Sequence, residues 1–538
     1  MKKRDKRLLI IAGILAGLFI GLLVAGTVIR KKIEKELADT RLGEFRFTCE
    51  RVQVNLVRQS LTLRGVRLKS EERDVPPDSL LDKTVQYLDA QIGMLTVRGI
   101  SLKAIRNKDI ELSNLIIDAP DITIVTRQMP DSISSTENGS SLRKLAIEAI
   151  GITNGTLDWR QITDTDTLQC KIFGLNTQLD HMQVDSTRQS RERFLFSQDM
   201  EGSVQTLRYT FANSAYILAL DSLAWDYNGQ LLSVLNAELL PQFSKTDFPR
   251  RSVRKSDYMQ LDLKNLAVIG LDFDHLWNQK EVRIDSVYAT NGNFVSFKDR
   301  NAVVPQRVKP MMHTTIQNIP IPLSIRKIRL ENTNATYEEL AKYGSYAGAV
   351  TFNEIDATFY GFTNIVTRKD QYVELYARSK VNGAGELTAV VSMPVDPEND
   401  YFEAKATLVN VPMSALNRMV TPLAKMEIET GHIDRLDFTM AGSGRTARMD
   451  MILRYHDLKI GLLKREDRQW QQRTGLSNLV NWAIIHSDNP DKKGLRTAQT
   501  TVQRDIHRSV FNYLWKGISA GALETAETGT ARRLLGNK

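Results

Sequence analysis

The sequence predicts a mainly β protein, in which an N-terminal transmembrane helix precedes an elongated antiparallel β-sheet. We also expect a few amphipathic helices, including one near the C-terminus. Two observations lead to this prediction. Apolar residues alternate by two through most of the chain, with polar turns between the runs. A long apolar segment also lies beside basic residues at the N-terminus.

The size of the chain allows a large core. It has 538 residues, of which 42% are hydrophobic. This length suits about three domains or one elongated array. Composition alone does not choose between them.

The N-terminal segment predicts a membrane anchor. Leu8 to Ile29 contains no charged residue and is about as long as a helix needs to cross a hydrocarbon core. A cleaved signal peptide is the alternative, but Arg30, Lys31 and Lys32 stand where a small-residue cleavage site is expected. A small excess of basic residues before the segment predicts that residues 1–7 are a cytoplasmic tail. Gly13, Gly17 and Gly21 lie four residues apart on one helix face and could let a second copy of the helix approach, which would allow self-association.

The distribution of charge argues against nucleic acid as a partner. The formal charge of the chain is +9, and up to Lys35 nine basic residues face two acidic ones, a net of +7. The remainder therefore carries only 9 − 7 = +2. Binding to a phosphate backbone requires a concentrated basic field, which a nearly neutral body lacks.

One apolar pattern recurs along the chain. In "LAIEAIGITNGTLDWR", Leu145 and Ile147 alternate, the phase flips once, and Ile150 and Ile152 alternate again before Asn154-Gly155. A strand keeps such residues on one face only if a β-bulge or a corner absorbs the flip. Similar patterns begin at Ile110, Val282 and Leu323. Spacings of about 35 and about 40 residues argue against a strict solenoid and favour related hairpin-like units along an extended sheet.

Turns and helices are predicted at a few places. Asn382-Gly383 and Gly442-Ser443-Gly444 suit hairpin turns between alternating runs. Pro412 to Met426 predicts a helix that Pro422 kinks. Val502 to Ala522 predicts an amphipathic helix that covers the last sheet edge or contacts a membrane surface or a partner. Its apolar stripe includes Val510, Phe511, Leu514, Trp515 and Ile518.

Sequence signatures of catalysis are absent. The seven histidines are scattered, and no metal-binding, nucleophile-elbow or phosphate-loop motif occurs. Cys49 and Cys170 are too few for a disulfide framework or a structural zinc site. Asp272 and Asp274, like the pair in "TDTDT" (Asp164 and Asp166), would share one strand face, and we expect them to be solvated acids and not ligands of a cation. We therefore expect no enzyme activity, no metal and no cofactor.

Both ends of the chain resemble AsmA-like proteins of the bacterial envelope. The resemblance lies in the basic tail and apolar span, in "VNLVRQSLTLRGVRLKS" and "QIGMLTVRGISLKAIRNKDIELSNLIIDAPDITIV", and in "LNRMVTPLAKMEIETGHIDRLDFTMAGSGRTARMDMILRYHDLKIGLL" with "SVFNYLWKGISAG". It covers roughly residues 1–125 and 405–523. The resemblance implies a single-pass inner-membrane protein with most of its chain in the periplasm. The periplasmic part would be a curled antiparallel sheet that forms a long, open hydrophobic groove, like that of the bridge-type lipid transporters. The chain looks shorter than the longest bridging members of that family.

The predicted organisation follows from these features. We expect a basic tail at 1–7, an anchor at 8–29, a periplasmic β-groove at 30–411, an AsmA-like C-terminal region with helices and final strands at 412–523, and a flexible tail at 524–538.

The function that this resemblance implies is binding of lipid acyl chains and support of phospholipid transport toward the outer membrane. A curled sheet with its apolar face inward would shield acyl chains at about 0.8 kcal/mol per buried methylene, and a uniform groove would let them slide. The candidate groove residues are Leu61, Leu63, Ile122, Ile124, Leu157, Phe294, Leu387, Ala389, Phe438 and Met440. Each of them also suits the core of an ordinary packed sandwich.

Two other classes of function remain open on the sequence. A non-enzymatic scaffold or assembly factor for outer-membrane components would present sheet edges and loops to protein partners and would have a filled interior. An envelope enzyme that acts on glycans would need acids converging from distant strands. The expected partners of the preferred function are phospholipid, the inner membrane and outer-membrane or envelope proteins.

Overall fold

The computed structural model contains two compact units, both built mainly of β-strands. It describes residues 39–42, 45–55, 58–70, 87–99, 109–127, 144–162, 167–185, 193–211, 215–252, 257–302, 307–466, 469–472 and 485–528. The predicted anchor Leu8 to Ile29 lies outside these residues. Unit 1 comprises Met1–Ala237 and Gly270–Lys280, and unit 2 comprises Glu238–Ile269 and Glu281–Lys538.

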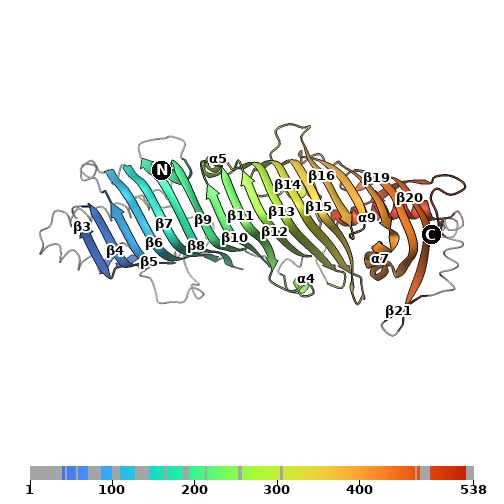
Figure 1. The fold of residues 1–538 in the computed structure, drawn as a ribbon, viewed down its shortest axis with the longest axis horizontal. Helices are drawn as coiled ribbons and strands as arrows, with labels where there is room; N and C mark the ends of the chain where they lie inside the picture. Colours follow the sequence, from blue (N-terminus) through green and yellow to red (C-terminus); the bar gives the residue numbers. More distant parts are fainter. Residues whose placement is uncertain are drawn as a thin grey trace. The chain divides into compact units, whose positions relative to one another are not determined.

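Unit 1 is a curled sheet in which successive strands from Arg51–Asn55 onward are neighbours, and Phe45–Thr48 pairs with Ser60–Ser70 (Figure 1). Its strands are β1 (Asp39–Leu42), β2 (Phe45–Thr48), β3 (Arg51–Asn55), β4 (Ser60–Ser70), β5 (Tyr87–Arg98), β6 (Asp109–Arg127), β7 (Lys144–Ile162), β8 (Thr167–Asp185), β9 (Asp199–Thr210) and β10 (Tyr216–Asp226). Its helices are η2 (Phe194–Phe196) and α5 (Phe273–Gln279). Strand β11 (Leu231–Pro241) contains the boundary between the units.

Unit 2 has a second curled sheet with more helices. Its strands are β12 (Tyr258–Ile269), β13 (Val282–Asp299), β14 (Leu323–Leu340), β15 (Ala347–Thr363), β16 (Tyr372–Val381), β17 (Gly385–Pro394), β18 (Phe402–Pro412), β19 (Met426–Gly442), β20 (Thr446–Glu466), β21 (Gln469–Gln472) and β22 (Thr497–Gln503). Its helices are α4 (Phe248–Arg251), α6 (Met312–Gln317), η3 (Met413–Leu416), α7 (Asn417–Ala424) and α9 (Val510–Ala526). The predicted turns at Asn382-Gly383 and Gly442-Ser443-Gly444 join β16 to β17 and β19 to β20.

Most of the strand pairs within the units are antiparallel, as predicted, but β6 with β7 and β13 with β14 are parallel. β6 pairs β7 with Ile110 opposite Leu145, and β13 pairs β14 with Val282 opposite Leu323. These four strands contain the four copies of the repeated pattern. Two copies that follow one another in the sequence therefore lie side by side and in register in the sheet. The prediction of hairpin-like units is therefore wrong. Asn154-Gly155 and Asn291-Gly292 lie within strands and not in turns.

The predicted phase flip is present, and it occurs at the same level in neighbouring strands. In β7 the apolar face moves from Ile147 to Ile150 while the register with β6 and β8 is kept. In β8 the same level contains His181, whose φ is +53°. A second break, which the sequence pattern did not reveal, lies at Asn154 with a φ of +50° and is accompanied by a register shift against β8.

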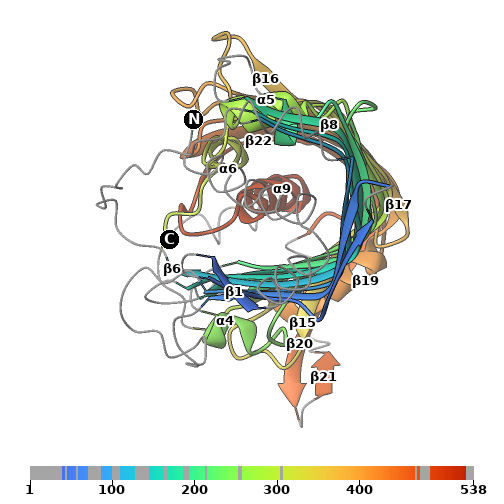
Figure 2. The same cartoon turned by 90° about the vertical axis from the view of Figure 1, so that its left-hand side faces the viewer.

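The second break forms a line of left-handed residues across each sheet. In unit 2 Asn291 and Asn332 are neighbours on β13 and β14, with φ of +53° and +48°, and the Nδ2 of Asn332 donates to the Oδ1 of Asn291 at 2.6 Å. Asn265 on β12 and Glu354 on β15 continue the line. Asparagine tolerates this conformation better than most residues. Because bulges bend strands, aligned bulges explain why the sheet of each unit turns a corner (Figure 2).

The helices confirm one prediction and correct another. η3 and α7, with Pro422 inside α7, occupy the predicted helix at Pro412 to Met426. The predicted start of the last helix at Val502 is wrong, because Val502 pairs with Ala447 as part of β22. α9 begins after Ser509, whose Oγ accepts from the N–H of Asn512 at 3.3 Å, and it continues into the predicted tail at 524–538, ending at Ala526.

Candidate functional site

One face of the unit 1 sheet, called here the unit 1 inner face, has continuous rows of apolar side chains. Ile122 pairs with Ala90 on one side and Leu157 on the other, and Ile124 pairs with Leu88 and Trp159. The first row crosses seven strands, which is about 29 Å at the usual strand spacing. It consists of Leu68, Ala90, Ile122, Leu157, Ile172, Leu207 and Leu220.

The candidate residues of unit 1 all lie on this face but differ in exposure. Leu61 and Leu63 are only 1% exposed, whereas Ile122, Ile124 and Leu157 are half-buried. The described helices of unit 1 lie at one end of the strands: Phe194 of η2 packs on Trp277 of α5 at 5.5 Å.

These two helices lie too far along the strands to cover the first row of apolar side chains. The segment after η2 is tied to Asp180 and Asp199, because the Ser197 Oγ donates to both of their carbonyls at 2.7 Å. On β9, Leu207 of the first row lies eight residues beyond Asp199, about 26 Å along the strand.

The corresponding face of unit 2, the unit 2 inner face, is filled over the strands from β16 to β22. Met440 and Met449 are 0% exposed and belong to a core with Met311 and Ile316 from α6 and its N-cap, and with Tyr513 from α9. Figure 2 shows α9 within the curve of the sheet, and it contacts β19, β20 and β22. Of the unit 2 candidates, Met440 is therefore core, whereas Phe294, Leu387, Ala389 and Phe438 are half-buried.

Helix α9 packs through residues that the predicted stripe only partly included. Val510, Leu514 and Ile518 contact the core, Phe511 packs on Tyr337 at 4.6 Å, and Trp515 is half-buried. The closest approach is made by Gly517 and Gly521, where an added Cβ would lie 2.8 Å from the Cε of Met449 and 3.0 Å from Met451. Gly517 and Gly521 are four residues apart, and Tyr513 lies one helical turn earlier. This spacing was the sequence feature that could have indicated which face of α9 packs on the sheet.

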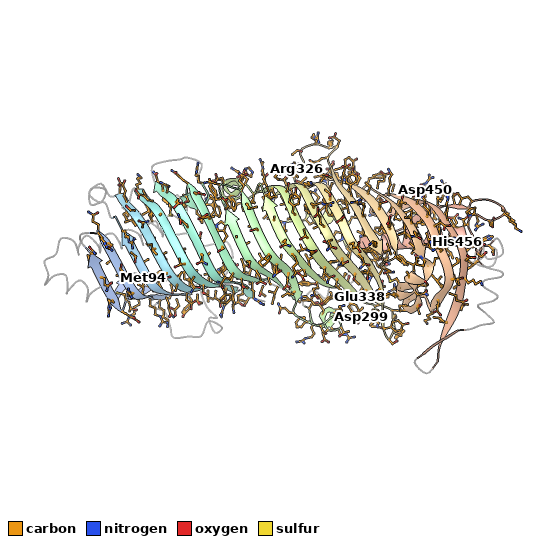
Figure 3. The ribbon with its side chains drawn as sticks, viewed as in Figure 1. Met94, Asp299, Arg326, Glu338, Asp450 and His456 are labelled. Carbon is orange, nitrogen blue, oxygen red and sulfur yellow. The ribbon has the colours of Figure 1, made fainter. Side chains whose placement is uncertain are left out.

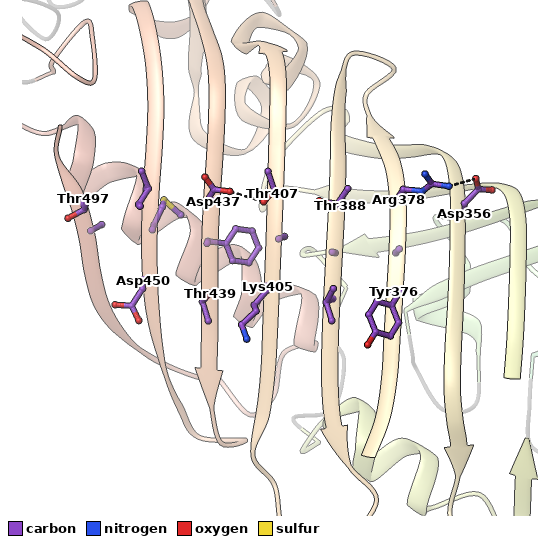
Figure 4. A pocket seen from close by; sticks show the side chains of 18 of the residues that line it. Asp356, Tyr376, Arg378, Thr388, Lys405, Thr407, Asp437, Thr439, Asp450 and Thr497 are labelled. Carbon is purple, nitrogen blue, oxygen red and sulfur yellow. Dashed lines mark hydrogen bonds and ion pairs between the residues drawn. The ribbon is translucent and has the colours of Figure 1, made fainter. Parts of the chain in front are cut away.

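The opposite face of unit 2 contains a trough of about 760 Å³ between β14 and β22 (Figure 4). Most of its charged and hydroxyl side chains alternate with the inner-face residues along the strands, and Ala389 and Phe438 are also among its lining residues. Its carboxylates have partners: Arg378 lies 3.8 Å from Asp356, and the Thr407 hydroxyl donates to Asp437 at 2.7 Å. The hydrogen bond from Arg435 holds the pKa of Asp437 below its usual range, despite partial burial. Ion pairs and hydrogen-bonding side chains therefore line this trough together with apolar residues such as Val390 and Ile452.

The two aspartates of "LDFDH" do not share a strand face, contrary to our expectation. Asp272 caps α5 by accepting from the N–H of His275 at 2.8 Å, and Asp274 accepts from the Tyr227 hydroxyl at 2.8 Å. Burial and this hydrogen bond raise the pKa of Tyr227 to about 12. Asp164 and Asp166 lie outside the described residues. Among the residues that the structure describes, no cluster of His, Cys, Asp and Glu could hold a metal ion.

Cys49 and Cys170 are not joined in a disulfide, and burial raises the pKa of both thiols. In the described part of the chain, no helix is both long and apolar enough to cross a bilayer. No family model and no curated protein matches this chain.

Proposed function

We propose that this protein is an AsmA-like, single-pass inner-membrane protein that binds lipid acyl chains on the inner faces of its curled periplasmic sheets. Its role would be to support phospholipid transport toward the outer membrane. The single observation that carries the proposal is the half-buried apolar row of the unit 1 inner face, about 29 Å across.

The arrangement suits acyl chains for a physical reason. A half-buried row of Leu and Ile side chains retains a methylene chain by removing it from water, at about 0.8 kcal/mol per methylene. Because equivalent side chains repeat from strand to strand, neighbouring positions along the row differ little in free energy. Binding of this kind requires no catalytic group.

A second candidate, a non-enzymatic scaffold or assembly factor for outer-membrane components, is favoured by the filled unit 2 inner face. A closed core there resembles an ordinary packed domain, which presents its loops and edges to partners. The two candidates differ in whether lipid contacts the inner face of unit 1.

Photo-crosslinking of the full-length chain in its native membrane separates the candidates. A photoreactive phenylalanine analogue would replace Ile124 or Phe294 and, as matched controls, the adjacent Thr123 or Val295, which alternate to the opposite face. We expect phospholipid adducts at Ile124 and Phe294 and none at the controls, as detected by mass spectrometry. Absence of lipid adducts at all four positions would overturn the proposal and favour the scaffold.

A further inference from the structure

A row of charged side chains crosses the ends of β12, β13 and β14 on the unit 2 inner face. Lys298 of β13 lies opposite Glu339 of β14, and Asp257 immediately precedes β12. Glu339 is only 4% exposed and Lys298 is half-buried. Charged groups in such positions are costly unless they are paired, so each requires a partner.

The carboxylates of this row are already paired. Arg300 donates to the Oε1 of Glu339, Tyr337 donates its hydroxyl hydrogen to the Oε2 at 2.7 Å, and Lys309 donates to Asp257. The side chain of Lys298, in contrast, forms no hydrogen bond or ion pair with any residue that the structure describes. Among the described residues of this row, three cations (Lys298, Arg300 and Lys309) therefore accompany two carboxylates, which leaves one positive charge in excess.

The environment of Lys298 disfavours its charged form. Desolvation by burial lowers the pKa of Lys298, and the charges of Asp257 and Glu339 offset this only in part. Lys309 and Arg508 lower it further. An anion placed beside the ammonium group would stabilise the charged form of Lys298.

Polarity changes steadily along the strand that carries Lys298. Ser296, two residues earlier, lies opposite Tyr337, and Phe294, two residues earlier again, lies between Leu261 and Ala335. The distance from Lys298 to Phe294 along the strand is about 13 Å. Charge, hydroxyl groups and apolar side chains therefore follow one another on the same face, as they do in an amphiphile.

The opposite face of the same strand ends has no such excess. Glu338 accepts from Lys245 at 2.7 Å, and Asp299 lies 3.5 Å from Arg250. Figure 3 shows Glu338 and Asp299 at the same margin of the sheet. In the described part of these strand ends, the uncompensated charge thus lies on the inner face.

We propose that Lys298, with Lys309 and Arg300 beside it, binds the phosphate group of an anionic phospholipid whose acyl chains lie toward Phe294. This inference rests on the proposed function, and it adds the class of headgroup and the place where it binds. The ammonium group supplies up to three hydrogen bonds to the phosphate oxygens.

The test uses the purified full-length chain with a photoreactive phenylalanine analogue at Phe294. The chain is mixed with vesicles of phosphatidylcholine alone or of phosphatidylcholine and phosphatidylglycerol in equal parts, and lipid adducts are measured by mass spectrometry. We expect more adduct with the anionic vesicles, by about tenfold if one charge-assisted hydrogen bond is gained. Lys298→Gln abolishes that preference, Lys298→Arg keeps it, and the matched control Lys245→Gln on the opposite face leaves it unchanged.

Other results overturn the inference in distinguishable ways. Equal adduct with both vesicles, or a preference that survives Lys298→Gln, rejects the headgroup site but leaves acyl binding intact. Absence of adduct with every vesicle, at Phe294 and also at Ile124, rejects the proposed function itself. If inorganic phosphate at the same phosphorus concentration removes the preference, the site binds soluble phosphate and the lipid assignment is wrong.

Discussion

Units 1 and 2 are built by the same means but differ in what lies on their inner faces. Each has an in-register parallel pair, β6 with β7 and β13 with β14, and each has left-handed residues aligned across its strands. In unit 2, α9 and α6 contribute to the core that contains Met440 and Met449. In unit 1, the row through Ile122 and Leu157 is only half-buried.

This difference shows that the strand pattern alone does not decide between a groove and a core. Alternation supplies an apolar inner face in both units, and a separate segment decides whether that face is covered. In unit 2 this segment is mainly α9, which comes near the end of the chain. The following predictions test whether that covering is the real distinction.

The largest expected effect is on core side chains of unit 2. Met440→Ala should lower the free energy of unfolding by about 2–5 kcal/mol, because the side chain is fully buried and leaves a cavity. Ile122→Ala in unit 1 should cost less than about 2 kcal/mol, because its side chain is only partly buried in the folded chain. Denaturant unfolding of the full-length chain, with hydrogen exchange to locate the loss, measures both. Equal costs would mean that the unit 1 inner face is as closely packed as that of unit 2.

The next effect concerns the close contact between α9 and the sheet. Gly517→Leu should destabilise unit 2 by about 1–3 kcal/mol, because even a Cβ there lies 2.8 Å from Met449 and 3.3 Å from the Sδ of Met440. Ser519→Leu, at an exposed position of the same helix, is the matched control. If α9 is what closes this face, the Gly517 variant should also gain lipid adducts at a photoprobe placed at Phe438. No gain despite a displaced α9 would argue against that role.

A smaller effect is expected at the corners, and it should be similar in both units. Asn154→Val in unit 1 and Asn291→Val in unit 2 should each cost about 1–2 kcal/mol, because a β-branched residue is strained at a positive φ. Asn154→Gly and Asn291→Gly keep the backbone conformation accessible and serve as controls. Thermal or denaturant unfolding checks these values. A tolerated valine would show that the left-handed residues do not fix the corner.

Much of the fold could be predicted because the residues of a single strand or turn are enough to identify it. Leu61, Leu63, Ile122 and Ile124 were placed on one face by alternation, and the turn at Asn382-Gly383 by its turn chemistry. The partner of each strand was not predictable in the same way, because alternation is identical in parallel and antiparallel pairs. The 35-residue offset between Ile110 and Leu145 contained the parallel pairing, but only the structure distinguishes it from a chain of hairpins.

The candidate site was predicted only in part for a similar reason. The amphipathic pattern of α9 indicated an apolar stripe but not the surface that it covers, so Met440 was assigned to a groove and is core. The charged row at Lys298 and Glu339 was missed because, in sequence, polar residues at the end of a strand look solvated. Only the pairing of β13 with β14 and the contact of Tyr337 with Phe511 place this row on the inner face.

The smallest effect compares buried charge on the outer faces of the two units. Burial alone would raise the pKa of Asp158 in unit 1, but hydrogen bonds from Arg160 and Gln169, each at 2.8 Å, outweigh it and hold the pKa below its usual range. A carboxyl with a lowered pKa in the folded state adds stability above its unfolded pKa of about 3.9, and this is lost as pH falls through the folded value. Asp158→Asn should therefore cost less than about 1 kcal/mol near neutral pH, because Arg160 is partly exposed, and nothing well below the folded pKa.

The equivalent change in unit 2, Asp437→Asn, should have the same sign and a smaller size. The pKa of Asp437 is also lowered, first by Arg435, but that arginine is more exposed than Arg160 and solvent screens the pair more strongly. Unfolding of each variant and of the unchanged chain near neutral pH and in acid gives the two differences. A difference that does not shrink in acid would show that the hydrogen-bond geometry, and not the charge, is what Asp158 and Asp437 contribute. A larger effect at Asp437 would mean that the outer face of unit 2 is shielded from water in the full-length chain.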